Sequence, residues 1–364
     1  MHGGRCRGGP LTTAGFAVLA LALAACGGRS GTGTKVPSTT TPVSSSPGPT
    51  ARVIPTLPTA TTAPARTTAP AGRTAGPGTS AVCGFLPSSK VSYRHVVWIW
   101  MENHSYSTVI GSPSAPFENQ LASECGLATN YHNITHPSLP NYVAATSGLP
   151  IGSLGPFGSD CNPGASCRAG PSVESIFSQV PSWKAYEESM PAPCDHANSG
   201  EYAVRHNPPP YFEAVAGNCA ANDVAFTRFA ADLNGGNLSA FSFITPNLID
   251  DTHDGSVADG DRWLRTNVGA IVSSPAYRAG SVALFVTWDE GEGGSASNCA
   301  TNTADVGCHV ASIVVSPSTP PGTRSATLFN HYSLLRTAED LLGLPPIASA
   351  ATATPMESAF GLAG

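Results

Sequence analysis

Four runs of apolar residues constrain the fold of this chain more than any other feature of its sequence. The runs are rich in β-branched and aromatic side chains and each ends at polar residues, which is typical of short strands buried on both faces of a sheet. They lie at 95–101, 241–244, 282–288 and 310–315. Segments with apolar residues at helical spacing lie between or after them, at 226–233, 260–273 and 332–342. This alternation predicts the α/β class, a three-layer α/β/α sandwich with a mostly parallel central sheet.

Polar side chains stand where the predicted strands end. Glu102 and Asn103 come directly after the first run, and Asp289 and Glu290 come directly after the third. Taken singly, each is by default explained as a helix cap or a solvated turn. Ligands of open α/β sheets bind at the carboxyl ends of the strands, and carboxylate and amide oxygens gathered there suit a divalent metal cation. We therefore predict such a cation, of unspecified identity, at this edge.

Ser138 is the candidate nucleophile. It stands between Pro137 and Pro140, just before a segment that resembles the start of a helix at 143–148. A serine at a helix N-terminus lies near free backbone N–H groups and the positive end of the helix dipole, where it can bind or attack a phosphate. The commoner use of serine at this position is as an N-cap. The two prolines favour a fixed, exposed turn.

The first 26 residues have the pattern of a signal peptide. Arg5 and Arg7 precede an apolar run at 16–25 that is too short to span a bilayer. The exit resembles a bacterial lipobox with Cys26 at the cleavage position, so we predict lipidation of Cys26; the alternative is an ordinary signal peptide with an incidental cysteine. The chain is then exported, either as a cell-membrane lipoprotein that faces outward or as a secreted protein.

Residues 27–82 are expected to form a disordered tether. They are mostly Thr, Pro, Ser, Ala and Gly, and such a stretch cannot bury enough apolar surface to offset the entropy of ordering. The folded catalytic domain is therefore predicted at 83–364. Its partners are expected to be a substrate and, through the anchor, the membrane. Nucleic acid is excluded as the main partner because the net charge is -6, and we expect a monomer.

Eight of the ten cysteines fall in the predicted folded domain. An even number in an exported chain favours disulfides, although spacing alone leaves their connectivity open. A metal–thiolate site is the alternative, but the chain has no Cys-x-x-Cys pair. Pairing of sequence neighbours predicts the disulfides Cys83–Cys125, Cys161–Cys167, Cys194–Cys219 and Cys299–Cys308.

An ordered set of motifs resembles a known family. The motifs are Glu-Asn-His-Ser-Tyr at 102–106, Pro-Ser-Leu-Pro-Asn at 137–141, Thr-Pro-Asn at 245–247 followed by His253-Asp254, Thr-Trp-Asp-Glu at 287–290, and Asn-His-Tyr-Ser-Leu-Leu-Arg-Thr at 330–337. The set is similar to the bacterial phosphoesterase family, which holds secreted acid phosphatases and phosphatidylinositol-phosphate phosphatases of the mycobacterial type. That family belongs to the alkaline-phosphatase-like superfamily, and the resemblance covers about 93–360.

The resemblance implies a role for each matching residue. Glu102, Asn103, Asp289 and Glu290 match metal ligands, Ser138 matches the nucleophile, and Asn141 would donate to a phosphate oxygen. His206, His253 with Asp254, and His331 match residues around the phosphate, with their roles as second-metal ligand, phosphate clamp or general acid left open. His104, His136 and His309 are expected to be structural.

The activity implied is that of a metal-dependent acid phosphatase, which hydrolyses phosphomonoesters, phosphoinositides among them, through a phosphoserine intermediate. One alternative within the family is a phosphodiesterase of the phospholipase C type. Another is a lipoprotein that binds a ligand without catalysis.

Overall fold

The computed structural model describes residues 81–294 and 297–362. The signal peptide, Cys26 and nearly all of the tether predicted above lie outside the described residues. Within the described part, no helix has the length and apolarity that crossing a bilayer requires.

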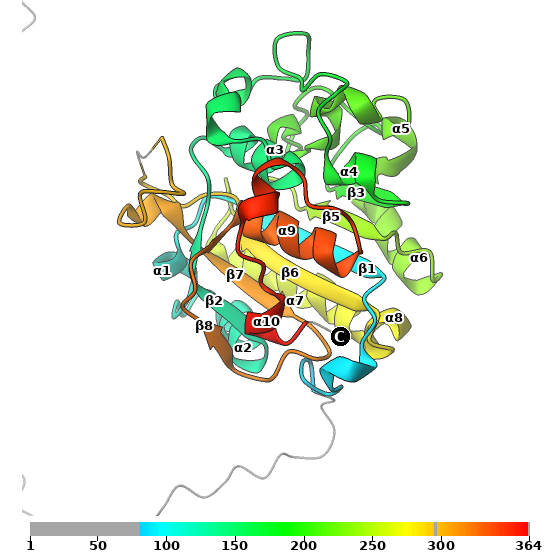
Figure 1. Cartoon of the computed structure of the whole chain (residues 1–364), viewed down its shortest axis with the longest axis vertical. Helices are drawn as coiled ribbons and strands as arrows, with labels where there is room; N and C mark the ends of the chain where they lie inside the picture. The colour runs from blue at the N-terminus through cyan, green and yellow to red at the C-terminus, as the bar shows by residue number, and fades with distance from the viewer. Residues whose placement is uncertain (1–80, 295–296, 363–364) are drawn as a thin grey trace, which may run out of the picture. The chain divides into compact units, whose positions relative to one another are not determined.

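The described residues form one nine-stranded sheet (Figure 1). The four predicted strands are confirmed as β1 (His95–Met101), β5 (Phe241–Thr245), β6 (Val282–Trp288) and β7 (His309–Val315). The others are β2 (Gly126–His132), β3 (Trp183–Glu187), β4 (Asp223–Ala225), β8 (Thr323–Ser325) and β9 (Phe329–Asn330). The strand order is β4-β3-β5-β1-β6-β7-β2-β8, and β9 also pairs with β2.

The sheet is mostly parallel, as predicted, with one reversed strand among those described. β7 pairs antiparallel with both β6 and β2, whereas the other pairings are parallel. The start of β7 therefore lies at the edge where β1 and β6 end. A segment that leaves β6 can reach β7 without crossing the sheet.

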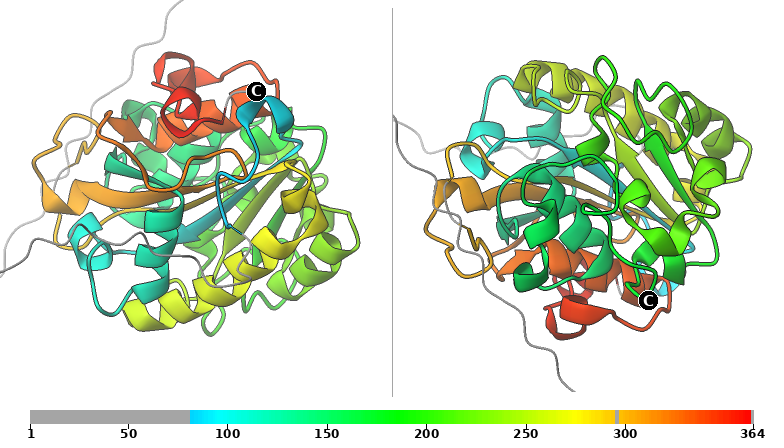
Figure 2. Two further views of the ribbon diagram at one scale, coloured as in Figure 1. Left: turned by 90° about the horizontal axis from the view of Figure 1, so that it is seen from below. Right: turned by 90° about the horizontal axis from the view of Figure 1, so that it is seen from above.

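Helices cover both faces of the sheet (Figure 2), which confirms the three-layer α/β/α class. On one face α3 (Ser138–Ser147) packs against α9 (His331–Leu341), and on the other α2 (Pro116–Glu124) packs against α7 (Val257–Ser273). The predicted apolar face of α7 is buried, and its first turn is closed by a capping box between Ser256 and Asp259.

The predicted helix at 226–233 is a 3-10 turn (Phe226–Arg228) that continues into α6 (Phe229–Asn234). The other short α-helices are α1 (Tyr106–Val109), α4 (Ile176–Gln179), α5 (Cys219–Asn222), α8 (Pro275–Arg278) and α10 (Glu357–Phe360). The remaining 3-10 turns are Ser88–Lys90, Ile151–Ser153, Gly155–Phe157, Val204–His206, Pro209–Tyr211, Glu213–Val215, Val306–Cys308 and Ala348–Thr352.

The four predicted disulfides are present: Cys83–Cys125, Cys161–Cys167, Cys194–Cys219 and Cys299–Cys308. Each removes conformations from the unfolded chain and contributes on the order of 2–4 kcal/mol to stability. The metal–thiolate alternative is excluded for these eight cysteines, because their sulfur atoms are bonded to one another.

Two further carboxyl groups are buried in the half of the sheet beyond β5. Glu187 and Asp223 lie on the neighbouring strands β3 and β4, and neither is more than 1% exposed. Burial raises the pKa of Asp223 to about 8, although the Asn207 amide, 2.8 Å away, opposes this shift. Burial and the nearby Asp223 also raise the pKa of Glu187 well above its usual range.

This pair predicts a loss of stability with rising pH. Between about pH 4 and pH 8 the folded protein holds a proton on Asp223 that the unfolded chain releases, so the free energy of unfolding falls as pH rises. We expect the free energy of unfolding to fall by about a few kcal/mol from pH 5 to pH 8, which lowers the wild-type Tm by several degrees. Asp223→Asn should reduce this fall. Thermal scans at both pH values, with the exposed Glu174→Gln as control, measure it. An unchanged slope in Asp223→Asn would contradict the assignment.

Candidate active site

The candidate site lies where β1 and β6 end and α3 begins. The backbone N–H of Glu102 donates to the carbonyl of Asp251 at 2.8 Å, and that of Asp289 donates to Met101 at 3.0 Å. These bonds continue the sheet past its last strand residues and bring the polar residues of separate strands together. The predicted gathering of acids at this edge is therefore present.

Ser138 is the first residue of α3 and is 2% exposed. Its Oγ donates to Oε2 of Glu102 at 3.2 Å, and it also lies near the carboxyl group of Asp289. The next residue, Leu139, gives its backbone N–H to Asp160 Oδ1 at 2.9 Å, which caps the helix from outside. The serine hydroxyl is thus held between two carboxyl groups at a helix N-terminus.

Asn103 has a left-handed backbone conformation, with φ 56°. Asparagine tolerates this region better than most side chains. The turn aims its backbone N–H at Oδ1 of Asp289, 3.3 Å away. The local sequence Glu-Asn thus lets the chain turn sharply at the strand end while holding the neighbouring acid in place.

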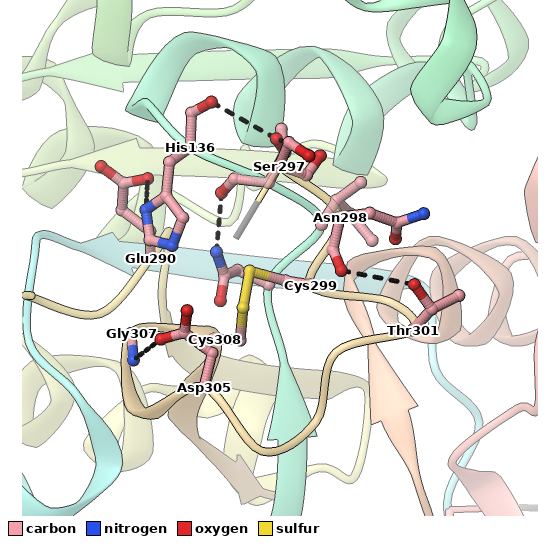
Figure 3. Close-up of a disulfide and its surroundings, with 12 residues drawn as sticks. His136, Glu290, Ser297, Asn298, Cys299, Thr301, Asp305, Gly307 and Cys308 are labelled. Carbon is pink, nitrogen blue, oxygen red and sulfur yellow. Dashed lines mark hydrogen bonds and ion pairs between the residues drawn. A yellow bond between two sulfur atoms is a disulfide. The ribbon is translucent and has the colours of Figure 1, made fainter. Parts of the chain in front are cut away.

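Glu290, the neighbour of Asp289, pairs with His136, whose Nδ1 lies 2.6 Å from Oε2 of Glu290 (Figure 3). His136 and the predicted ligands Asn103 and Glu290 line an open cavity of about 510 Å³ at the mouth of the site. The expectation that His136 is merely structural is therefore incomplete, because it partners a predicted metal ligand.

The structure adds Asp251 to the site, a residue that the sequence analysis missed. His206, in the 3-10 turn Val204–His206, is 2% exposed and lies between two acids. Its Nδ1 is 3.3 Å from Asp251 Oδ2, and its Nε2 is 3.3 Å from Glu102 Oε2. The three side chains form a group whose ligand atoms all lie within 4.8 Å of one another.

Tyr142, one turn into α3, is the second missed residue. It is fully buried, its hydroxyl donates to Oε1 of Glu102, and its ring stacks on that of His206 with centroids 5.4 Å apart. Tyr142 therefore fixes the orientation of Glu102, whose other oxygen faces Ser138 and His206.

The electrostatics of this cluster favour a cation. Burial raises the pKa of Glu102 well above its usual range, and Asp289 and Asp251 raise it further. Burial, followed by the charge of Glu290, does the same to Asp289. Oδ2 of Asp289 is buried without a hydrogen-bond partner. Carboxylates this close repel one another unless protons or a cation compensate them, so the donor set fits a divalent metal.

Two predicted residues have other roles in this geometry. Asn141 was expected to donate to a phosphate oxygen, but its amide donates to the carbonyls of Thr135 and Pro137. His331 was expected near the phosphate, but it is fully buried, with Nε2 2.7 Å from the carbonyl oxygen of Asp289 and Nδ1 3.0 Å from the Tyr131 hydroxyl. Both support the loops that carry the site.

His253 and Asp254 lie at the rim. His253 lines the open cavity; its Nδ1 is 2.7 Å from Asp254 Oδ1 and its Nε2 is 3.0 Å from Arg205 Nη2. Its ring centroid lies 5.6 Å from that of His206. Arg205 thus brings a permanent positive charge next to the acids.

The chain is similar to known proteins in both sequence and fold. A model of the Phosphoesterase family matches residues 112–345. A phosphatidylinositol-3-phosphatase of Mycobacterium tuberculosis is 33% identical over 279 residues, which cover 76% of this chain and 86% of that protein. An acid phosphatase of Aspergillus fumigatus is 27% identical over 289 residues, which cover 74% of this chain and 60% of that protein.

Among solved structures, a protein in the alkaline phosphatase superfamily from Vibrio parahaemolyticus aligns with a TM-score of 0.49 and 10% identity, covering 72% of this chain and 71% of that one. The family match spans well over half of the chain and includes Ser138 and the acids at the end of β6. The chain therefore belongs to the Phosphoesterase family, and it is a hydrolase of the phosphatase type.

Proposed function

We propose that this chain is an exported, metal-dependent acid phosphatase that hydrolyses phosphomonoesters with Ser138 as nucleophile. The observation that carries the proposal is the Ser138 hydroxyl, which lies at the N-terminus of α3 and donates to Glu102 at 3.2 Å within a group of buried acids. A serine in this position has an acceptor for its proton and lies at the positive end of the helix dipole.

In the first step Ser138 Oγ attacks phosphorus, the bond from phosphorus to the leaving oxygen breaks, and the hydroxyl proton passes to Glu102. His206, oriented by Asp251, gives a proton to the leaving oxygen. Water then attacks the phosphoserine: His206 takes a proton from the water, Glu102 returns its proton to Ser138 Oγ as the bond from phosphorus to Oγ breaks, and inorganic phosphate is released.

Glu102, Asn103, Asp289 and Glu290 are the residues proposed to hold the metal. A bound divalent cation would stabilise negative charge on the phosphoryl oxygens and lower the pKa of the serine hydroxyl. Glu102 and Asp289 already flank that hydroxyl, and the unpartnered Oδ2 of Asp289 supports the assignment.

The substrate class is proposed from the relatives. One relative is a phosphatidylinositol-3-phosphatase and another is an acid phosphatase, and both names describe removal of a phosphate monoester. We therefore propose phosphomonoesters, with phosphoinositides as candidate physiological substrates. A phospholipase C activity would instead cleave a diester.

The test is a substrate panel on the purified chain. We expect turnover of p-nitrophenyl phosphate and of phosphatidylinositol 3-phosphate in vesicles, with little turnover of bis-p-nitrophenyl phosphate or phosphatidylcholine. Preferred release of diacylglycerol would support the phospholipase C alternative. Absence of turnover on every ester, with metal supplied, would favour a ligand-binding lipoprotein.

Export and anchoring are proposed from the N-terminal pattern and the four disulfides, which form in oxidising compartments. Labelling of the expressed chain with a fatty acid, compared with Cys26→Ala, tests lipidation. Label that persists in the variant would contradict it.

The role of His206 gives a prediction that depends on the leaving group. His206→Gln is expected to lower kcat about 10²-fold or more for glycerol phosphate, whose alkoxide needs a proton, and much less for p-nitrophenyl phosphate, whose phenolate leaves without one. His95→Gln is the matched control, because His95 begins β1 at the opposite end of the strand from Glu102. Equal losses for both substrates, with loss of bound metal, would make His206 a metal ligand instead.

A further inference from the structure

The segment at 134–137, called here the nucleophile turn, leads directly into Ser138 and is held from two sides. On the side of α3, Asn141 Oδ1 accepts the N–H groups of Ile134 and Thr135 at 2.9 and 3.0 Å. Its amide donates to the carbonyls of Thr135 and Pro137 at 2.8 and 3.1 Å. One side chain therefore ties the turn to the helix that carries the serine.

The opposite side of the turn is held by residues between β6 and β7. The backbone N–H of Cys299 donates to the carbonyl of Ile134 at 2.9 Å, and the Thr135 hydroxyl donates to the carbonyl of Ser297 at 3.0 Å. Figure 3 shows Ser297 and Cys299 beside His136. These contacts come from the segment between β6 and β7 and not from the sheet itself. The position of the turn therefore depends on how firmly this segment is held.

The Cys299–Cys308 disulfide fixes it. Cys308 directly precedes β7, its carbonyl accepts the N–H of Asn133 at 3.2 Å, and both cysteines are fully buried. The disulfide therefore links the segment that hydrogen-bonds to the nucleophile turn to the start of β7.

The same connection packs against His136. A Cβ at Gly294 would lie 2.6 Å from His136 Nε2, and Gly307 lies against Gly294. The ring of His136 is thus confined between glycine backbone on one side and Glu290 on the other.

We propose that the Cys299–Cys308 disulfide is a positioning device for catalysis: it holds the nucleophile turn, and through it Ser138 and His136, in the reactive arrangement. This inference rests on the proposed role of Ser138. The disulfide is expected to raise kcat, in addition to the stability that any disulfide supplies.

The test compares two cysteine pairs. Cys83–Cys125 is the matched control, because it is equally buried and closes a longer loop, and Cys125 precedes the start of β2, at the end of the sheet away from Glu102. We expect Cys299→Ala/Cys308→Ala to lower kcat about 10- to 100-fold, as misplacement of a reacting group does, with KM changed less than about threefold. Cys83→Ala/Cys125→Ala should lower Tm and leave kcat near wild type.

A second variant keeps the proposal testable if the first pair fails to fold. Thr135→Val removes the hydroxyl bond to Ser297 in a disulfide-intact protein and should lower kcat several-fold without lowering Tm to match. In a folded Cys299→Ala/Cys308→Ala background the same substitution should have little further effect, because the two changes act on one contact.

Wild-type kcat in folded Cys299→Ala/Cys308→Ala, wild-type kcat in Thr135→Val, or fully additive effects would overturn the proposal. These results differ from failure of the proposed function, in which the wild-type protein itself hydrolyses no phosphomonoester.

Discussion

Ser138→Ala should reduce turnover of p-nitrophenyl phosphate by at least about 10³-fold while the fold is retained. Removal of a nucleophile eliminates the covalent route and leaves only the electrostatic contribution of the site. The fold should survive, because the Ser138 Oγ bonds to Glu102 within the site and the N-terminus of α3 is capped independently by Asp160. Steady-state kinetics and thermal unfolding measure the two effects.

Ser153→Ala, in an exposed 3-10 turn, is the matched control and should behave as wild type. Trapping of a phosphorylated protein during turnover, followed by peptide mapping, should place the phosphate on Ser138. Near wild-type turnover in Ser138→Ala would remove Ser138 as the nucleophile.

Asp289→Asn and Glu102→Gln should each lose both bound metal and activity, with kcat reduced about 10²-fold or more. Both carboxyls are fully buried beside Ser138, so a substitution that removes charge changes the ligand set without opening a cavity. Metal analysis of the purified proteins, with turnover measured before and after a chelator, tests this expectation.

The exposed Glu213→Gln provides the control for loss of one carboxylate. If wild type and both variants bind no metal and the chelator leaves turnover unchanged, the metal site is wrong. A metal-free reaction that uses His206 or His253 then becomes the better hypothesis.

The parts of the fold that are buried on both faces could be predicted from sequence alone. β1 and β6 have the bounds expected from their apolar runs, because a central strand has no polar face and a change to polar residues marks its end. β2 and β4 could not be found this way. β2 contains half-buried Thr129 and Asn130, and β4 has three residues that begin with a buried Asp223.

The residues of the candidate site also differ in whether the sequence could predict them. Glu102 and Asp289 were predictable because each follows a strand directly. Asp251 lies in a polar loop six residues past β5, where no periodicity distinguishes it from Asp250 or Asp254. Tyr142 reads as an apolar helix residue, and only the fold shows that its hydroxyl reaches Glu102.

The sequence also could not predict which way a polar side chain points. Asn141 and His331 stand in motifs that suit phosphate contact, and their spacing is the same whether they face the ligand or the backbone. Their hydrogen bonds to Thr135, Pro137 and the Asp289 carbonyl show which way they point.

Because β7 runs opposite to β6, the connection from Asp289 to Cys308 can change in length without rearranging the sheet. It leaves β6 and enters β7 at one edge, and the N–H of Gly291 closes its base on the carbonyl of Gly307 at 2.9 Å. A crossover between parallel strands would have to pack over a whole face of the sheet, whereas the described residues of this connection begin and end at the edge that carries the site. Doubling its length would cost only about 0.6 kcal/mol in closure entropy. Grafts that vary the exposed residues 301–304 and keep Ser297, Cys299 and Cys308 are therefore expected to leave both the strands and the nucleophile turn in place.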